Sequence, residues 1–146
     1  MIEGVIKTPL KQIYDERGDI LHMLRATDPH FDHFGEVYFS WANPGYIKAW
    51  KKHKEITINF AVPVGTIQVV VFDDRQQSSS FNRVQEFVLG REDYYLLTIP
   101  ANLWYGFRAI GNHAALVTNC ATGPHDPLEA LRRDLHDPAI PYQWND

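Results

Sequence analysis

Five stretches of the sequence alternate between apolar and polar residues with a period of two, and this alternation restricts the folds open to the chain. The stretches are EVYFSWA at 36–42, ITINFAVPVG at 56–65, TIQVVVFDD at 66–74, RVQEFVLG at 83–90 and DYYLLTIP at 93–100. They are rich in Val, Ile, Phe and Tyr, which strands favour, and Gly and Pro separate them, as in NPG at 43–45. Many short strands at close spacing predict an all-β sandwich or barrel.

One segment near the end has helical character instead. In DPLEALRRDL at 126–135, Asp126 suits a helix N-cap and Pro127 suits the first turn. Leucines recur at 128, 131 and 135, which is the three- and four-residue spacing of one helix face. We therefore expect one short C-terminal helix that closes an end of the sheet and has a packing role.

Length and charge narrow the class of protein. A chain of 146 residues predicts a single domain, 1–146, and a net charge of −4 gives no reason to expect a nucleic-acid partner. No segment is long and apolar enough to predict a membrane span, and the first residues do not resemble a secretory signal. The single cysteine, Cys120, is typical of a reducing compartment, so a cytoplasmic location is expected.

Several segments, in order along the chain, resemble one known family. They are DERGD at 15–19, NPGYIKAW to VPVGTIQVVVFDDR between 43 and 75, LLTIPANLWYGFRAIGNHAALV at 96–117, and DPAIPYQW near the end. Together they are similar to the dTDP-4-dehydrorhamnose 3,5-epimerases, metal-free cupins that act on nucleotide-linked 4-keto-6-deoxy sugars. The resemblance implies a cupin jelly-roll barrel, or double-stranded β-helix. It also implies a homodimer that exchanges N-terminal segments and an isomerase of surface-polysaccharide sugar biosynthesis, such as that of lipopolysaccharide O-antigen.

The residues at the family's catalytic positions differ from the family pattern. In the strand GYIKAWK, Lys48 takes the place of an arginine that binds the diphosphate, and Lys51 takes the place of the histidine base. Asn119, or Thr118 if the alignment slips by one, stands where the family has its acid, a tyrosine. The family carboxylate that orients the base lies in a C-terminal extension beyond the end of this sequence. No carboxylate partner for the base is therefore expected.

Other family positions are retained or replaced in ways that suggest roles. Arg17, in DERG, matches the segment that clamps the nucleotide diphosphate, and Glu36 is also kept. Tyr105 stands where the family usually has a histidine in a Pro-x-x-x-x-His turn. The resemblance thus implies substrate binding by Arg17, Glu36, Lys48 and Asn119.

Chemistry at C3 of a 4-keto sugar requires a base and an acid. Lys51 and His53 are two residues apart, so in a strand they share a face. Partial desolvation beside other cations would lower the pKa of Lys51 toward neutrality, and His53 titrates near neutral pH without such tuning. Tyr105 and Tyr38 are the candidates for the acid. The cluster KKHKE is also compatible with an ordinary solvated surface, because lysine is seldom buried.

A metal cupin is disfavoured by the same stretch. Metal-dependent cupins use a His-x-His pair, a glutamate and a later histidine, whereas this chain has Lys51, His53, Glu55 and Tyr105. We expect no metal and no cofactor. The expected function is a nucleotide-sugar epimerase that acts at C3, with or without C5. Two alternatives stay open: a non-catalytic cupin that binds a nucleotide sugar, and a cupin 3,4-ketoisomerase.

Overall fold

The computed structural model describes residues 1–145, and every regular element in that range is a strand. No helix among these residues is long and apolar enough to cross a membrane. The strands are β1 (Ile6–Pro9), β2 (Gln12–Ile13), β3 (Ile20–Leu21), β4 (Glu36–Ala42), β5 (Ile47–His53), β6 (Ile58–Val64), β7 (Thr66–Phe72), β8 (Val84–Gly90), β9 (Tyr95–Ile99), β10 (Trp104–Ala109), β11 (Ala115–Ala121) and β12 (Ala130–Arg132).

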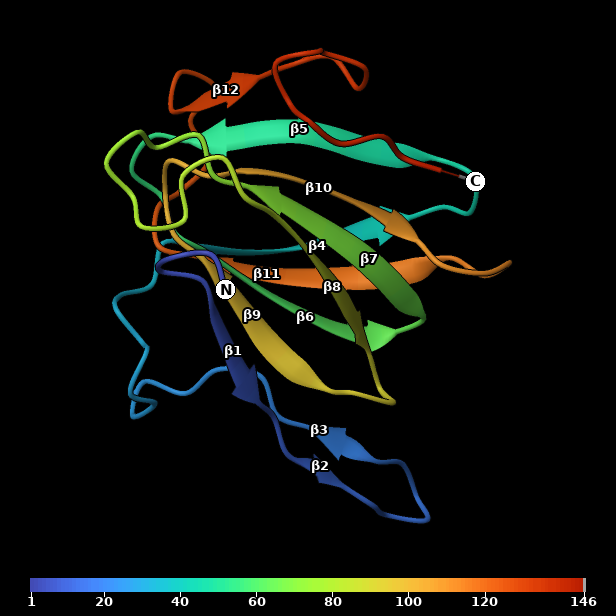
Figure 1. The fold of residues 1–146 in the computed structure, drawn as a ribbon. Helices are drawn as coiled ribbons and strands as arrows, with labels where there is room; N and C mark the ends of the chain where they lie inside the picture. Colours follow the sequence, from blue (N-terminus) through green and yellow to red (C-terminus); the bar gives the residue numbers. More distant parts are fainter. Residues whose placement is uncertain (146) are drawn as a thin grey trace.

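Two five-stranded antiparallel sheets form the body of the protein. One has the order β1-β9-β6-β11-β4 and the other β12-β5-β10-β7-β8, while β2 and β3 form a separate hairpin. Figure 1 shows the two sheets facing each other, with the β2–β3 hairpin projecting at one end and β12 lying over β5 at the other. The prediction of an all-β cupin jelly roll is confirmed.

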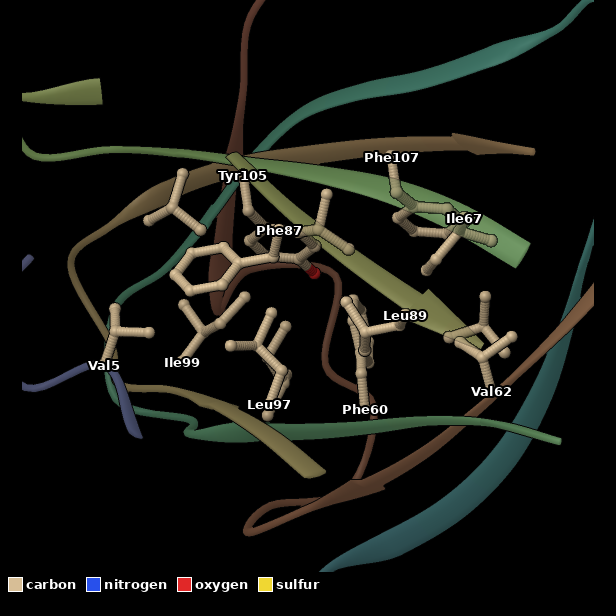
Figure 2. Packing of buried hydrophobic residues seen from close by; sticks show 14 of the residues in the cluster. Val5, Phe60, Val62, Ile67, Phe87, Leu89, Leu97, Ile99, Tyr105 and Phe107 are labelled. Atoms are coloured by element: carbon tan, nitrogen blue, oxygen red, sulfur yellow. The ribbon is translucent and has the colours of Figure 1, made fainter. Parts of the chain in front are cut away.

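The main core lies between the two sheets and follows from the alternation in the sequence. Ile67, Val69 and Val71 on β7 point into it and meet side chains such as Phe60 and Leu97 from the other sheet (Figure 2). The intervening residues Val70 and Phe72 belong to a second apolar cluster on the outer face, together with Trp50, Trp104 and Ile140. The C-terminal segment thus covers the outer face of this sheet, which explains why β7 is apolar on both faces.

The predicted helix at 126–135 is wrong. The Asp126 carboxylate accepts a hydrogen bond from Leu128 N at 2.9 Å, and Glu129 N donates to Asp126 O at 3.0 Å, so the segment begins with a turn. Residues 130–132 then pair with β5 as the edge strand β12. Leu128, whose spacing suggested a helix face, is 80% exposed. Because so short a helix is marginal by itself, pairing with the free edge of β5 decides the conformation.

A register shift between β5 and β10 determines which lysines reach the interior. Tyr105 is opposite Lys51, but Phe107 is opposite Lys48, so β5 has one extra residue at this point. A Cβ on Gly106 would lie 2.4 Å from the Cβ of Ala49, so glycine is required for the close approach of the two strands. As a result Lys48 and Lys51, three residues apart, line the same cavity.

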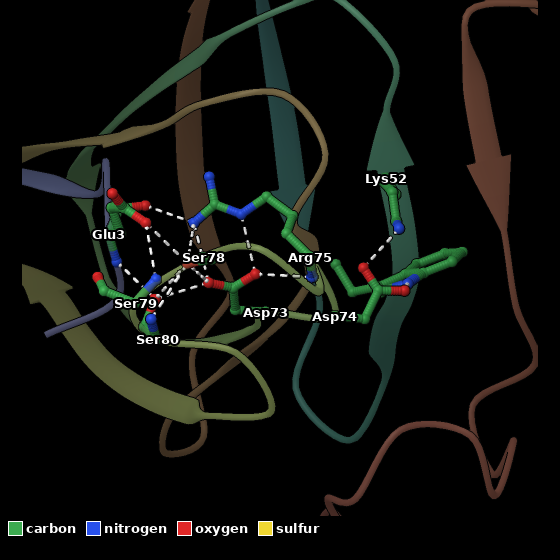
Figure 3. A network of polar contacts seen from close by, with 9 residues as sticks. Glu3, Lys52, Asp73, Asp74, Arg75, Ser78, Ser79 and Ser80 are labelled. Atoms are coloured by element: carbon green, nitrogen blue, oxygen red, sulfur yellow. Dashed lines mark hydrogen bonds and ion pairs between the residues drawn. The ribbon is translucent and has the colours of Figure 1, made fainter.

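A buried carboxylate ties the N-terminal segment to the loop after β7 (Figure 3). Asp73 has no exposed surface. It accepts hydrogen bonds from the Arg75 guanidinium at 2.9 Å and from the hydroxyls of Ser78 and Ser80 at 2.6 Å each. Arg75 also donates to Glu3 O at 2.7 Å. The network holds the loop in place, and Asp74 follows directly from it.

Candidate active site

A cavity of about 880 Å³ opens between the two sheets, a volume within the usual range of small-molecule sites. Tyr38 and Ser40 of β4 line one wall, and Lys48 and Lys51 of β5 with Tyr105 of β10 line the other. The remaining lining includes the apolar side chains of Phe60, Phe107 and Val117 and, from β12 and the residues after it, Arg132, Arg133, Asp134 and Asp137. The cavity therefore combines apolar side chains with a rim of two arginines and two aspartates, of which Arg133 and Asp137 form an ion pair at 3.3 Å.

Of the lysines on β5, Lys51 alone has no partner among residues 1–145. Lys48 donates to Ser40 Oγ at 2.8 Å and to Trp41 O at 2.7 Å, and Lys52 pairs with Asp74 at 2.6 Å (Figure 3). The half-buried Lys51 ammonium makes no hydrogen bond or ion pair with any residue in 1–145. Burial, and then the charge of Arg132, lowers the pKa of Lys51. This ammonium is thus available to a ligand in the cavity.

The His53 side chain is held at both ring nitrogens. Nδ1 lies 2.6 Å from a carboxylate oxygen of Glu129, and Nε2 lies 3.0 Å from the hydroxyl of Tyr105. The rings of His53 and Tyr105 are stacked, with centroids 5.8 Å apart. The expectation that no carboxylate orients the site is therefore wrong, because Glu129 on the approach to β12 supplies one. That carboxylate comes from the segment that was predicted to be a packing helix.

The charges in this pair are set by burial and hydrogen bonds. Burial lowers the pKa of His53, against the opposing effect of Glu129. Although burial opposes it, the hydrogen bonds that Glu129 accepts lower the pKa of that carboxyl. Its second oxygen accepts from Glu55 N and Ile56 N, both at 2.9 Å. At neutral pH a neutral imidazole thus faces an ionised carboxylate.

His53 borders a second, much smaller cleft of about 30 Å³ rather than the large cavity. Lys51, Glu36 and Asn119 also line this cleft. A space of that size holds about one water molecule. Glu36 additionally accepts a hydrogen bond from His125 N at 3.2 Å.

Asn119 and Tyr38 are directly opposite each other on β11 and β4. Asn119 Nδ2 donates to the Tyr38 hydroxyl at 3.0 Å, and Asn119 Oδ1 accepts from Asn59 N at 3.1 Å. Asn119 is 1% exposed and does not line the large cavity. It therefore reaches that cavity through Tyr38, whose hydroxyl it holds.

Arg17 is the one predicted site residue that lies elsewhere. It belongs to the loop between β2 and β3, its side chain is 87% exposed, and it pairs with Asp15 at 2.7 Å. Figure 1 shows this hairpin at the opposite end of the molecule from β12. The other seven predicted residues all line the large cavity or the small cleft: Glu36, Tyr38, Lys48, Lys51, His53, Tyr105 and Asn119.

Residues in and beside β12 were missed as site residues. Glu129 contacts His53, Arg132 is opposite Lys51, and Arg133 lies with its guanidinium 5.0 Å from the ring centroid of Trp104. A sequence signal existed, since EALRR at 129–133 places one acid and two arginines within five residues in the last part of a β-rich chain. The leucine spacing concealed it by suggesting a helix.

Comparison with known proteins gives a match along the whole chain. The sequence profile of one family, dTDP-4-dehydrorhamnose 3,5-epimerase, matches residues 1–146. A probable low-salt glycan biosynthesis epimerase of Haloferax volcanii is 35% identical over 130 residues, which are 88% of this chain and 80% of that protein. The spore coat polysaccharide biosynthesis protein SpsL of Bacillus subtilis is 30% identical over 147 residues, covering 99% of this chain and 97% of that protein.

Solved structures agree with this match. The crystal structure of a dTDP sugar isomerase from Desulfovibrio desulfuricans is 46% identical and superposes with a TM-score of 0.96, covering 98% of this chain and 92% of that one. NovW of Streptomyces spheroides, a 4-keto-6-deoxy sugar epimerase, is 19% identical with a TM-score of 0.85, covering 99% of this chain and 76% of that one. At 19% identity the second likeness concerns the fold alone.

Proposed function

The chain belongs to the dTDP-4-dehydrorhamnose 3,5-epimerase family, and from that premise we propose that residues 1–146 form one cupin domain that epimerises a nucleotide-linked 4-keto-6-deoxyhexose. The reaction inverts C3, with or without C5. The observation that carries the proposal is that titratable side chains from both sheets line one cavity. Tyr38 comes from one sheet, and Lys51 and Tyr105 come from the other.

This arrangement suits the chemistry of inversion beside a carbonyl. A base must remove the α-proton, a cation or donor must stabilise the enolate, and an acid must return a proton to the opposite face of the sugar. Residues on two facing walls meet the last requirement directly. The β5 wall holds the candidate base Lys51, and the β4 wall holds the candidate acid Tyr38. The other candidate base, His53, lies behind Tyr105 at the small cleft.

The cations of the cavity suit the diphosphate of the substrate. Lys48 lies beside the apolar side of the cavity, with its ammonium 5.9 Å from the ring centroid of Phe107, and Arg132 and Arg133 lie on the rim. Guanidinium groups match phosphate oxygens in geometry and charge. We propose that these three side chains bind the diphosphate, with Glu36 at the far end of the site. Three related structures are named as complexes with dTDP or a dTDP-linked sugar, and they support the same substrate class.

A homodimer is part of the proposal. Val37, Phe39 and Trp41 lie on the outer face of the edge strand β4 and are 46%, 66% and 54% exposed. Such a stripe on a sheet edge is suited to contact with a second copy. In that dimer Arg17, which lies away from its own cavity, is proposed to reach the substrate of the other copy.

The pathway and location follow from the relatives. Two of them are named for glycan or spore coat polysaccharide biosynthesis. We propose that this chain supplies a sugar for a surface polysaccharide and that it works in the cytoplasm, where its single buried thiol, Cys120, stays reduced.

The test is incubation with nucleotide-linked 4-keto-6-deoxyhexoses in heavy water, followed by NMR. Deuterium at C3 together with an inverted centre is the expected result. A carbonyl shifted to C3 would indicate a ketoisomerase instead, and binding without any exchange would indicate a binding module. Lys51→Met and His53→Gln should each abolish exchange. Lys54→Met is the matched control, because Lys54 is an exposed lysine that lines neither cavity.

A further inference from the structure

We propose that Glu129, His53 and Tyr105 form a proton relay that acts as the base, with the hydroxyl oxygen of Tyr105 as the atom that receives the sugar proton. The inference rests on the proposed epimerase function and assigns the base within it. It places Tyr105, a candidate acid from the sequence, on the basic side of the reaction.

Access to the substrate distinguishes the members of the relay. Tyr105 lines the large cavity, whereas His53 borders only the small cleft, which is too small for a sugar. His53 touches the Tyr105 hydroxyl from behind, at 3.0 Å. If His53 exchanges a proton with a substrate, the proton must therefore pass through Tyr105.

The hydrogen-bond network assigns the direction of each proton. Glu129 accepts two backbone N–H groups on one oxygen, and its other oxygen faces His53 Nδ1 at 2.6 Å. An ionised carboxylate only accepts, so Nδ1 carries the proton and Nε2 presents a lone pair. The Tyr105 hydroxyl must then donate to Nε2. Its oxygen lone pairs are left for the substrate.

The proposed step is a concerted double transfer. The sugar C–H bond breaks, its proton forms an O–H bond with Tyr105, and the original phenolic proton moves to His53 Nε2. The electron pair of the C–H bond enters the enolate at the C4 oxygen. The new imidazolium lies against the Glu129 carboxylate, and Tyr105 is neutral before and after the step, so atoms and charge balance.

The surroundings favour a concerted step over a free phenolate. Burial strongly raises the pKa of Tyr105, and the nearby Tyr38 and Glu129 raise it further against the effect of Arg132. A separate phenolate is thus disfavoured, while proton transfer to His53 avoids it. The unpaired ammonium of Lys51, on the same wall, is placed to stabilise the enolate.

Glu129→Gln should reverse the relay without removing it. The amide oxygen would keep the two backbone N–H groups of Glu55 and Ile56, so the NH₂ group would face His53 Nδ1. His53 would then carry its proton on Nε2 and donate to Tyr105. The Tyr105 hydroxyl would become a donor toward the cavity and could not accept the sugar proton.

Two measurements test the relay on the chain of residues 1–146. First, ¹⁵N NMR of the histidine rings should show the Nδ1–H tautomer at His53 in the wild type and the Nε2–H tautomer in Glu129→Gln, with His53→Gln identifying the signals. Second, deuterium exchange at C3 of the nucleotide 4-keto sugar should fall by about 10² to 10⁴-fold in Tyr105→Phe, the usual contribution of a general base. In Glu129→Gln the exchange rate should fall by a comparable factor at every pH. In the matched variant Glu92→Gln, at an exposed glutamate, the exchange rate should be unchanged.

The outcomes separate the relay from the proposed function. Wild-type exchange that persists in a folded Tyr105→Phe would overturn the relay and leave the epimerase function standing. An Nε2–H tautomer at His53 in the wild type would overturn the relay even if no substrate were turned over. If His53 has the expected Nδ1–H tautomer but the wild type shows no deuterium exchange at C3, the epimerase function would be overturned instead.

Discussion

Asn119 donates its side-chain amide proton to the hydroxyl of Tyr38 at 3.0 Å, across the pair of strands β4 and β11. Because Asn119 Oδ1 is engaged by Asn59 N, the amide cannot turn round, and the Tyr38 oxygen is an acceptor in this contact. The Tyr38 proton is thus free to point into the cavity. Tyr105 on the facing wall has the opposite polarity, because its proton is directed to His53. One tyrosine is therefore set to donate and the other to accept.

Tyr38→Phe should separate exchange from inversion. Without the donor on the β4 wall, the enolate is reprotonated from the side on which it was formed, so deuterium should enter C3 with retained configuration. NMR of the product in heavy water measures both results, through loss of the C3 proton signal and the chemical shift of the C2 proton, which differs between the two C3 epimers. Tyr46→Phe, at a tyrosine 72% exposed, is the control. Inversion at the wild-type rate in Tyr38→Phe would refute Tyr38 as the acid.

The neighbouring lysines of β5 should respond in opposite ways to replacement by methionine. Lys51→Met removes an unpaired, half-buried ammonium, so turnover should fall by about 10²-fold or more while stability is unchanged or rises. Lys52→Met breaks the ion pair with Asp74 and should cost about 1–2 kcal/mol of unfolding free energy with little effect on turnover. Urea unfolding and exchange rates of both variants check this. A destabilised but active Lys51→Met would contradict it.

Stability should fall as the pH drops below the ordinary pKa of histidine. Burial lowers the pKa of His53 from 6.5 in the folded protein, so the unfolded chain takes up the proton first. The contribution of His53 to the free energy of unfolding is fully present above pH 6.5. It decreases as the pH falls from there to the pKa of His53 in the folded protein. Urea unfolding at about pH 7.5 and about pH 5.5 measures the difference. In His53→Gln the difference should shrink, and an unchanged difference would count against a neutral buried imidazole.

Asp73→Asn should destabilise the fold by at least about 2 kcal/mol. The buried carboxylate accepts hydrogen bonds from Arg75, Ser78 and Ser80. In the asparagine variant the amide NH₂ group would face one or more of these donor groups and could not accept from them. Thermal unfolding measures the loss. Asp93→Asn, which affects only an exposed ion pair with Lys7 at 3.2 Å, should change stability little. Equal effects of the two substitutions would show that the network in Figure 3 contributes no more than a surface pair.

The alternation in the sequence located the strands at 36–42 and 66–74 well. The sequence prediction failed at 126–135, where helical leucine spacing competed with pairing to the edge of β5. The strand expected at 36–42 has those bounds in the structure, and the stretch expected at 66–74 ends two residues earlier, at Phe72. The segment at 126–135 has leucines at helical spacing, yet its middle pairs with the edge of β5. Local spacing carries no information about an open strand edge elsewhere in the fold.

Within the site, residues two apart in a strand are expected to share a face, and Lys51 and His53 do line the same small cleft. The same rule does not place Lys48, because the extra residue in β5 shifts the register before it. The roles of Asn119 and Glu129 depend on single hydrogen bonds, to Tyr38 and to His53, that no spacing along the chain indicates.

The sequence by itself determined most of the strands and the family, and it predicted that Lys51 replaces the family's usual base. Only the tertiary structure decided which groups work together. Glu129 meets His53 from 76 residues away, and Tyr105 meets it from 52. The physical reason is that a strand's pattern records which side faces the core, whereas the direction of a proton depends on partners that folding brings from distant parts of the chain.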